Sequence, residues 1–188
     1  MSTTLIIIII IAVVIGVFVI SLYNKLVSYK INRENAFADI DVQLKQRHDL
    51  IPQLVSSVKG YMEHEAGVLT RVTEARSKAM GASSIDGKIE AEQELGAALQ
   101  GLRIQVEAYP DLKANTNFLQ LQGEISDVEN KLAASRRYFN SATKEYNVAV
   151  QTFPSNLIAG MFGFHSEKMF DLGTTERERL DQAPEIKF

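Results

Sequence analysis

Residues 110–153 read PDLKANTNFLQLQGEISDVENKLAASRRYFNSATKEYNVAVQTF, and this stretch decides the fold. Mostly apolar or small side chains recur in it at alternating steps of three and four residues. They are Phe118, Leu121, Ile125, Val128, Leu132, Ser135, Phe139, Ala142, Tyr146, Ala149 and Phe153. An average spacing of 3.5 residues keeps one apolar stripe turned toward a partner helix. The pattern therefore predicts one helix about 60 Å long, with coiled-coil-like packing.

A helix of this length must bury its stripe against other long helices. The 188 residues are enough for one hydrophobic core without disulfides. The sequence has no cysteine, which excludes disulfides, cysteine-ligated zinc, thiol nucleophiles and a lipidated cysteine.

The formal net charge is -3, and basic and acidic residues are interleaved, so there is no concentrated basic face of the kind that binds nucleic acid. We expect no nucleic-acid partner.

The N-terminal region is apolar enough for a membrane. Residues 5–22 read LIIIIIIAVVIGVFVISL, a run without charge that is just long enough to span the hydrocarbon core as a helix. A cleaved signal peptide would have a positive segment before this run and a small-x-small site after it, and neither is present. We predict a short N-terminus at residues 1–4 and a retained transmembrane helix at residues 5–23.

The charges that flank this run predict its orientation. Lys25, Lys30 and Arg33 follow it, and nothing positive precedes it. By the positive-inside rule, the short N-terminus lies outside and the rest of the chain lies in the cytoplasm. No proline or glycine interrupts the chain between Gly16 and Gln46. The membrane helix should therefore continue directly into the first cytoplasmic helix.

Pro52 is the first residue that could interrupt this helix. The apolar pattern nevertheless continues across it, at Phe37, Ile40, Leu44, Ile51, Leu54, Val58, Tyr61, Val68, Val72 and Ala75. The preserved register favours a kinked but continuous helix, whereas His48 and Asp49 before the proline favour a break with Asp49 as N-cap. Both alternatives stay open. In either case the helix should end near Met80, before the turn-rich residues 81–87.

A third helix is predicted from Lys88 to Tyr109. Its buried face comprises Leu95, Leu99, Leu102, Val106 and Tyr109. Pro110 should end it, and Asp111 is the expected cap of the long helix that follows. Together these segments predict an all-α fold, in which the transmembrane helix continues into an antiparallel bundle of long helices at residues 24–153.

The pattern changes after the bundle. Residues 157–164 read LIAGMFGF, which is too short to span a membrane and too apolar to be left in water. We predict that residues 154–164 fold back on the bundle, with the bilayer surface or a neighbouring subunit as the alternative contacts. Residues 165–188 are charged and weakly patterned, which predicts a flexible C-terminal tail.

Four long blocks carry a family resemblance. They are DVQLKQRHDLIPQLVSSVKGYMEHE at 41–65, YPDLKA at 109–114, FLQLQGEISDVENKLAASRRYFNSATKEYN at 118–147 and FPSNLIAGMFGF at 153–164. These blocks resemble the LemA family of bacterial membrane proteins. The resemblance implies a single-pass anchor in the bacterial inner membrane, a small N-terminus outside and an antiparallel bundle of long helices, but it implies no reaction. One branch of the family resembles a magnetosome-membrane protein, and some members are encoded beside membrane zinc proteases.

The residues offer little for catalysis or metal binding. The three histidines are His48, His64 and His165. A zinc site on a helix at His64 would need a further ligand three or four residues on, where Gly67 and Val68 stand, so the HExxH signature fails after its first two residues. His48 and Asp49 have no serine nucleophile paired with them by spacing. We predict no catalytic, cofactor-binding or metal-ligating residues.

Three polar side chains stand where the stripes would otherwise be apolar: Arg47, Glu65 and Ser135. A buried charge is costly unless it is paired, so Arg47 and Glu65 should find partners across the bundle or lie at its edge. We expect His48 and Asp49 to form a helix-junction network with Arg47. Such pairs can fix the register of neighbouring helices, as a single polar residue does in coiled coils.

Two functions remain compatible with these features. The first is a non-enzymatic, membrane-anchored scaffold that forms homo-oligomers and organises or curves the membrane, or holds partners at it. The second is an adaptor or regulatory subunit of a membrane protease or another envelope enzyme. In both cases membrane lipids are partners and no cofactor is expected. A scaffold would self-assemble when pure, whereas an adaptor would stay small until its partner is added.

Overall fold

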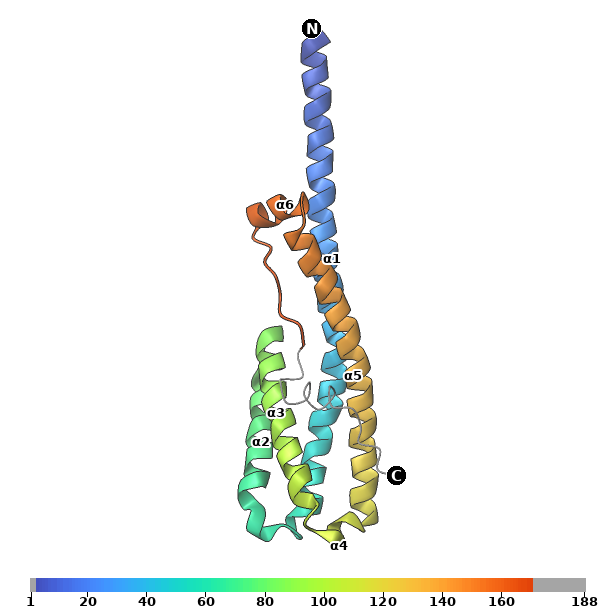
Figure 1. The fold of residues 1–188 in the computed structure, drawn as a ribbon, viewed down its shortest axis with the longest axis vertical. Helices are drawn as coiled ribbons and strands as arrows, with labels where there is room; N and C mark the ends of the chain where they lie inside the picture. The colour runs from blue at the N-terminus through green and yellow to red at the C-terminus, as the bar shows by residue number, and fades with distance from the viewer. Residues whose placement is uncertain (1–2, 171–188) are drawn as a thin grey trace, which may run out of the picture. The chain divides into compact units, whose positions relative to one another are not determined.

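The computed structural model describes residues 3–170, and every regular element in that range is helical. The elements are α1 (Thr3–Lys59), the 3-10 turn η1 (Glu63–Glu65), α2 (Ala66–Gly81), α3 (Ile85–Val106), α4 (Pro110–Lys113), α5 (Thr116–Gln151) and α6 (Ser155–Phe162) (Figure 1). The predicted all-α fold class is confirmed. The described chain forms two compact units, which we call unit 1 (residues 3–39 and 135–169) and unit 2 (residues 40–134 with Phe170). Helices α1 and α5 contribute to both units.

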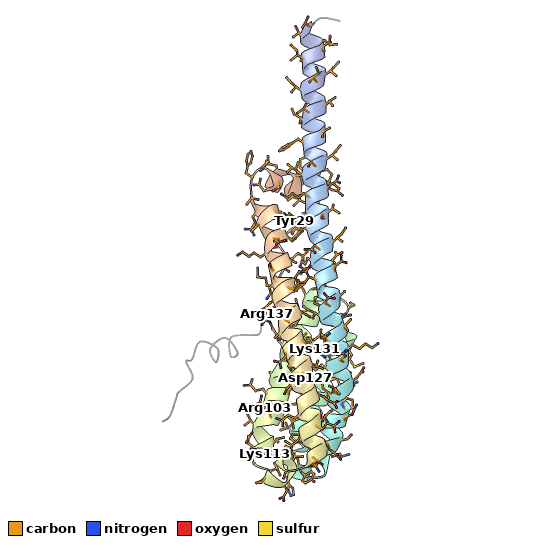
Figure 2. All side chains as sticks on the ribbon, turned by 90° about the vertical axis from the view of Figure 1, so that its right-hand side faces the viewer. Tyr29, Arg103, Lys113, Asp127, Lys131 and Arg137 are labelled. Atoms are coloured by element: carbon orange, nitrogen blue, oxygen red, sulfur yellow. The ribbon has the colours of Figure 1, made fainter. Side chains whose placement is uncertain are left out.

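The N-terminal part of α1 is apolar on all sides. Its large side chains from Leu5 to Phe18 are each 45–62% exposed, and Figure 2 shows them pointing away from the helix with nothing packed on them. Within residues 3–170, α1 is the one helix that is long and apolar enough to cross a membrane, judged by length and composition. A helical segment that is apolar on all sides needs an apolar environment. No other part of the described chain buries the large side chains from Leu5 to Phe18.

In unit 1, the C-terminal half of α5 packs on α1 around Phe139. The Phe139 ring is fully buried and meets the ring of Phe37 edge to face, with their centroids 5.4 Å apart. The guanidinium of Arg33 lies 5.0 Å from the centroid of the same ring. Phe139 thus joins an aromatic contact and a cation–π contact to α1.

In unit 2, the apolar faces of α1, α2, α3 and α5 share one core, which α4 and the turn after α1 complete. Its members are Ile51, Leu54, Val58, Met62, Val68, Leu69, Val72, Ala79, Ala91, Leu95, Leu102, Val106, Leu112, Phe118 and Leu121. Helices α2 and α3 lie side by side (Figure 1). Ser84 caps α3, because its hydroxyl accepts a hydrogen bond of 3.1 Å from the Gly87 amide.

Helix α1 continues through Pro52, so of the two alternatives at this proline the continuous helix is the one found. A proline has no N–H to offer the carbonyl four residues before it, which here is the carbonyl of His48. The side chain of Arg76 on α2 replaces this donor, since its Nε donates to the His48 carbonyl at 2.7 Å. Tertiary packing thereby satisfies the group that the proline leaves free.

We expect Arg76→Ala to lower the free energy of unfolding by about 1–3 kcal/mol, because the carbonyl of His48 would lose its donor. The loss should be smaller in a Pro52→Ala background, since the amide of residue 52 could then donate to this carbonyl. A double-mutant cycle by urea unfolding measures the coupling. Arg71→Ala, an exposed arginine on the same helix, is the matched control. An equal loss of unfolding free energy on Arg76→Ala in both backgrounds would show that Arg76 does not compensate for the missing N–H of Pro52.

A helix does end near Met80 as predicted, because α2 stops at Gly81, but the predicted uninterrupted helix up to that point is wrong. Helix α1 ends at Lys59, and the chain turns before α2 begins. Tyr61, which the apolar pattern placed on the buried stripe, is exposed, and its hydroxyl accepts a hydrogen bond of 3.2 Å from Asn115. Met62 fills the core position instead and is fully buried. The core therefore receives α1 and α2 as two helices rather than one.

The long helix also begins later than predicted. Pro110 starts the short helix α4, and α5 begins only at Thr116. Asp111 does not cap it: the side-chain oxygen of Asn115 accepts a hydrogen bond of 3.1 Å from the Phe118 amide. At its other end α5 stops at Gln151, so the predicted stripe residue Phe153 lies beyond the helix. Phe153 is 79% exposed.

Candidate functional site

A largely buried ion network joins α1, α3 and α5 in unit 2. Arg47 on α1 donates through Nη1 to the Glu129 carboxylate of α5 at 2.7 Å, and through Nη2 to the Glu92 carboxylate of α3. Nε2 of His48 lies 2.6 Å from the other oxygen of Glu92. Arg47, His48 and Glu92 are all buried. We call these four side chains the ion network.

The electrostatics of the network favour the charged form of Arg47. Burial on its own would lower the pKa of Arg47, but the neighbouring carboxylates of Glu129 and Glu92 raise this pKa above its ordinary value. The guanidinium is therefore held as a cation inside the unit. The guanidinium and the two carboxylates already bind one another, so we interpret this pairing as structural.

The structure places the other residues considered from the sequence away from any such network. His64 is exposed in η1, and His165 is exposed after α6. Glu65 is half-buried at the end of η1, and Arg47 pairs with Glu92 and Glu129 rather than with Glu65. In the part of the chain that the structure describes, no three His, Cys, Asp or Glu side chains are grouped to hold a metal ion.

Glu92 and Glu129 were missed from the sequence, although Glu92 carried a signal. It stands three residues before Leu95 and seven before Leu99, which are both stripe positions of the predicted third helix. A charge at such a position points to a buried partner. Glu129 directly follows the stripe residue Val128 and therefore stands outside the stripe, so its position gave no comparable signal. In the structure its side chain is partly exposed.

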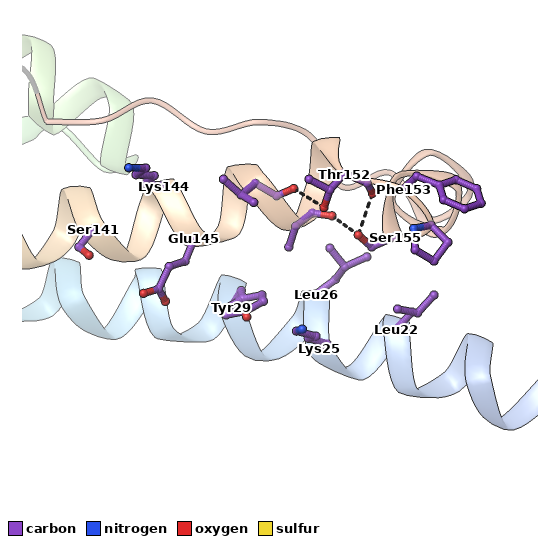
Figure 3. A pocket seen from close by; sticks show the side chains of 13 residues that line it. Leu22, Lys25, Leu26, Tyr29, Ser141, Lys144, Glu145, Thr152, Phe153 and Ser155 are labelled. Atoms are coloured by element: carbon purple, nitrogen blue, oxygen red, sulfur yellow. Dashed lines mark hydrogen bonds between the residues drawn. The ribbon is translucent and has the colours of Figure 1, made fainter.

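The candidate functional surface lies in unit 1, where the apolar run of α1 ends. A groove of about 520 Å³ runs between α1 and α5 (Figure 3). Leu22, Lys25 and Tyr29 line it from α1, opposite Lys144 and Glu145 of α5. It therefore combines an apolar end with charged side chains of both signs.

Two of the hydroxyls in this groove, those of Thr152 and Ser155, are already engaged by the chain itself. The Ser155 hydroxyl lies within hydrogen-bond distance of two carbonyls, those of Ala149 (2.6 Å) and Thr152 (2.9 Å). The Thr152 hydroxyl donates to the Val148 carbonyl at 2.8 Å. These contacts fix the turn from α5 into α6 (Figure 3). The hydroxyls of Thr152 and Ser155 thus hold this turn together, while Lys25, Lys144 and Glu145 bring charge to the groove.

Helix α6 closes the end of this surface by packing on α1. Ile158 and Ala159 are buried against Leu26, and Val19, Leu22, Tyr23, Ala149, Val150 and Phe164 pack around them. The ring of Tyr23 lies 4.9 Å from that of Phe162 and 5.8 Å from that of Phe164, measured between centroids. The segment after Pro154 thus folds back on α1, close to where the apolar run ends.

The chain after α6 is also held in place. Asn147 receives a hydrogen bond of 2.8 Å from the Glu167 amide and donates one of 2.9 Å to the Glu167 carbonyl. Arg33 pairs with the Glu167 carboxylate at 3.4 Å and donates to the Lys168 carbonyl at 3.2 Å. We call residues 164–169 the strap. The tail predicted at residues 165–188 thus starts with residues that contact α1 and α5, and residues 171–188 lie outside the described part of the chain.

Comparison with known proteins identifies the relatives of this chain. The chain is 29% identical to Protein LemA of Metamycoplasma hominis over 162 residues, which cover 84% of this chain and 73% of that protein. It is 22% identical to Magnetosome protein MamQ of Magnetospirillum gryphiswaldense, and 20% identical to Magnetosome protein MamQ 2 of Paramagnetospirillum magneticum. Each of these two alignments covers 79% of this chain and 64% of the relative, so the chain spans less than two thirds of the magnetosome proteins. The model of the LemA family matches residues 36–188, and the chain belongs to that family.

Proposed function

We propose that this chain is a non-enzymatic, membrane-anchored helical scaffold. In this proposal residues 5–23 cross the bacterial inner membrane, the short N-terminus lies outside, and both helical units lie in the cytoplasm. The observation that carries the proposal is the continuity of α1, which runs without a break from its apolar run into the packed helices of unit 1. A scaffold needs such a direct connection, because a flexible linker would leave the helices free to turn relative to the bilayer.

The family and the relatives support a place at a membrane. Relatives named as magnetosome proteins align over most of this chain. The large side chains of the apolar run are exposed from Leu5 to Phe18. The run is followed by Lys25 and Lys30, a charge pattern that favours a cytoplasmic location for the rest of the chain. Membrane lipids are therefore the first partners we propose.

Self-association is the second part of the proposal. Exposed apolar side chains on unit 2, namely Val42, Met80, Ile104 and Leu119, offer contact points to a second copy. Single exposed apolar residues are common and each contact would be weak. Confinement to the plane of a membrane raises the effective concentration of the copies, so weak contacts could suffice there.

The test is the assembly state of the full-length protein in mild detergent, measured by mass photometry beside a shortened chain that begins at Asn24. We expect particles of several copies for the full-length protein, and smaller particles for the shortened chain. A single copy at every concentration would refute the scaffold. It would favour the adaptor of a membrane protease or another envelope enzyme, which crosslinking could then capture.

A further inference from the structure

The outer face of α6 is apolar and uncovered. Ile158 and Ala159 face α1, but Leu157 and Met161, four residues apart on the helix, are 57% and 77% exposed. Phe153, four residues before Leu157, is 79% exposed. Leu157 and Met161 thus share an exposed face of α6, and Phe153 is exposed in the turn that precedes the helix. The transfer of these apolar side chains from water into an apolar environment would be favourable.

The contacts of α6 fix its depth along α1. The cluster around Ile158 and Ala159 includes Val19 and Leu22, which belong to the last turn of the apolar run. Since a helix rises 1.5 Å per residue, Val19 lies about 4.5 Å inside the end of that run. Tyr23, the first residue after it, touches Phe162. Helix α6 therefore lies at the level where the candidate membrane span ends.

We propose that α6 is a second membrane contact, with Phe153, Leu157 and Met161 inserted at the boundary between the headgroups and the acyl chains. This inference rests on the proposed function, because it needs α1 to span the bilayer. Apolar faces of interfacial helices enter this boundary by about 5–10 Å, which is close to the depth of about 4.5 Å at Val19. Tyr23 and the neighbouring Tyr29 also have amphipathic rings, which prefer this region.

The bilayer suits this face better than a second copy of the chain does. The exposed side chains lie on a helix that packs against Val19 and Leu22, in the last turn of the apolar run. In the proposed function the run before this turn is surrounded by lipid. Lys25 and Lys144 line the adjacent groove and could meet anionic headgroups there. A partner protein at this position would have to displace lipid already in contact with α1.

Fluorescence quenching in vesicles can test the depth of α6. The chain has no cysteine, so single cysteines can be introduced and labelled without background. The full-length variants Met161→Cys and Leu157→Cys carry an environment-sensitive dye on α6. Val14→Cys places it in the apolar run, and Ile104→Cys, also an exposed apolar position but on unit 2, is the matched control. The vesicles contain phosphatidylcholine and phosphatidylglycerol, with a nitroxide either near the headgroup or near the end of the acyl chain.

We expect the dye at residues 157 and 161 to lose more fluorescence to the shallow nitroxide than to the deep one. The dye at residue 14 should show the reverse order, and the dye at residue 104 should lose none. If residue 14 is quenched while residues 157 and 161 behave like residue 104, the inference is overturned and the anchor stands. A dye on α6 that is shielded from water but unquenched would also overturn it, in favour of a second copy. An unquenched residue 14 would remove the anchor and the inference with it.

Discussion

Glu92→Ala is expected to lower the free energy of unfolding by about 3 kcal/mol, toward the lower end of the range for breaking a buried ion pair. The Glu92 side chain is 1% exposed and contacts both Arg47 and His48. Without its carboxylate, Arg47 would remain charged and buried with a single partner. Glu129 would keep its bond to Arg47, which is the reason to expect the lower end. Urea unfolding of the full-length protein in mild detergent, followed by circular dichroism, measures the change.

Glu94→Ala is the matched control, two residues further along the same helix. Glu94 pairs with Lys78 at 2.5 Å, but its side chain is 54% exposed. An exposed ion pair contributes about 0–1 kcal/mol, so this substitution should be nearly silent. Equal losses for the two variants would show that burial of the ion network does not determine its contribution.

The ion network also constrains how the helices of unit 2 align. Arg47 lies on α1 and binds one carboxylate on α3 and another on α5. A slide of either helix by one turn, about 5.4 Å, would carry its carboxylate out of reach. An apolar stripe tolerates such a slide better, because one apolar side chain can replace another. The register role that the sequence suggested for Arg47 therefore belongs to its pairs with Glu92 and Glu129.

The periodicity of the sequence predicted which faces are buried better than where helices end. In the stripe of α5, Phe118, Leu132, Phe139 and Tyr146 are buried as predicted. The same method joined α1 to α2, because Val58 and Val72 are both in the core and are separated by a multiple of seven residues. A periodic pattern records which side chains are buried and does not record a reversal of the chain between them.

Local signals marked the turns that the periodicity missed. Gly60 directly follows Lys59, and a glycine after a basic residue is typical of a helix C-terminus. The continuity through Pro52, in contrast, depends on Arg76, which is distant in sequence. Nor could the sequence predict that α6 buries one side and exposes another, since every residue of LIAGMFGF is apolar or glycine. The tertiary contacts of α6, among them those with Leu26 and Tyr23, distinguish the two faces.

Phe139→Ala should have the largest effect in unit 1, with a loss of about 3–5 kcal/mol for a fully buried aromatic ring. The substitution removes the edge-to-face contact with Phe37 and the ring beneath the guanidinium of Arg33. Arg33 also holds the strap through Glu167 and the Lys168 carbonyl, so a less constrained Arg33 should loosen residues 164–169. Thermal unfolding measures the loss, and hydrogen–deuterium exchange locates it.

The neighbouring substitution Tyr138→Ala separates this effect from a general weakening of α5. Tyr138 is an exposed aromatic residue on the same helix, and its hydroxyl makes only a long contact of 3.4 Å with Asn32. The Tyr138→Ala substitution should therefore change the free energy of unfolding by no more than about 0.5 kcal/mol. It should also leave hydrogen–deuterium exchange in the strap unaltered. Faster exchange in the strap for Phe139→Ala alone would show that the Phe139 ring, through Arg33, couples α5 to the segment that follows α6. If both variants speed exchange equally, the strap depends on the helix as a whole and not on this ring.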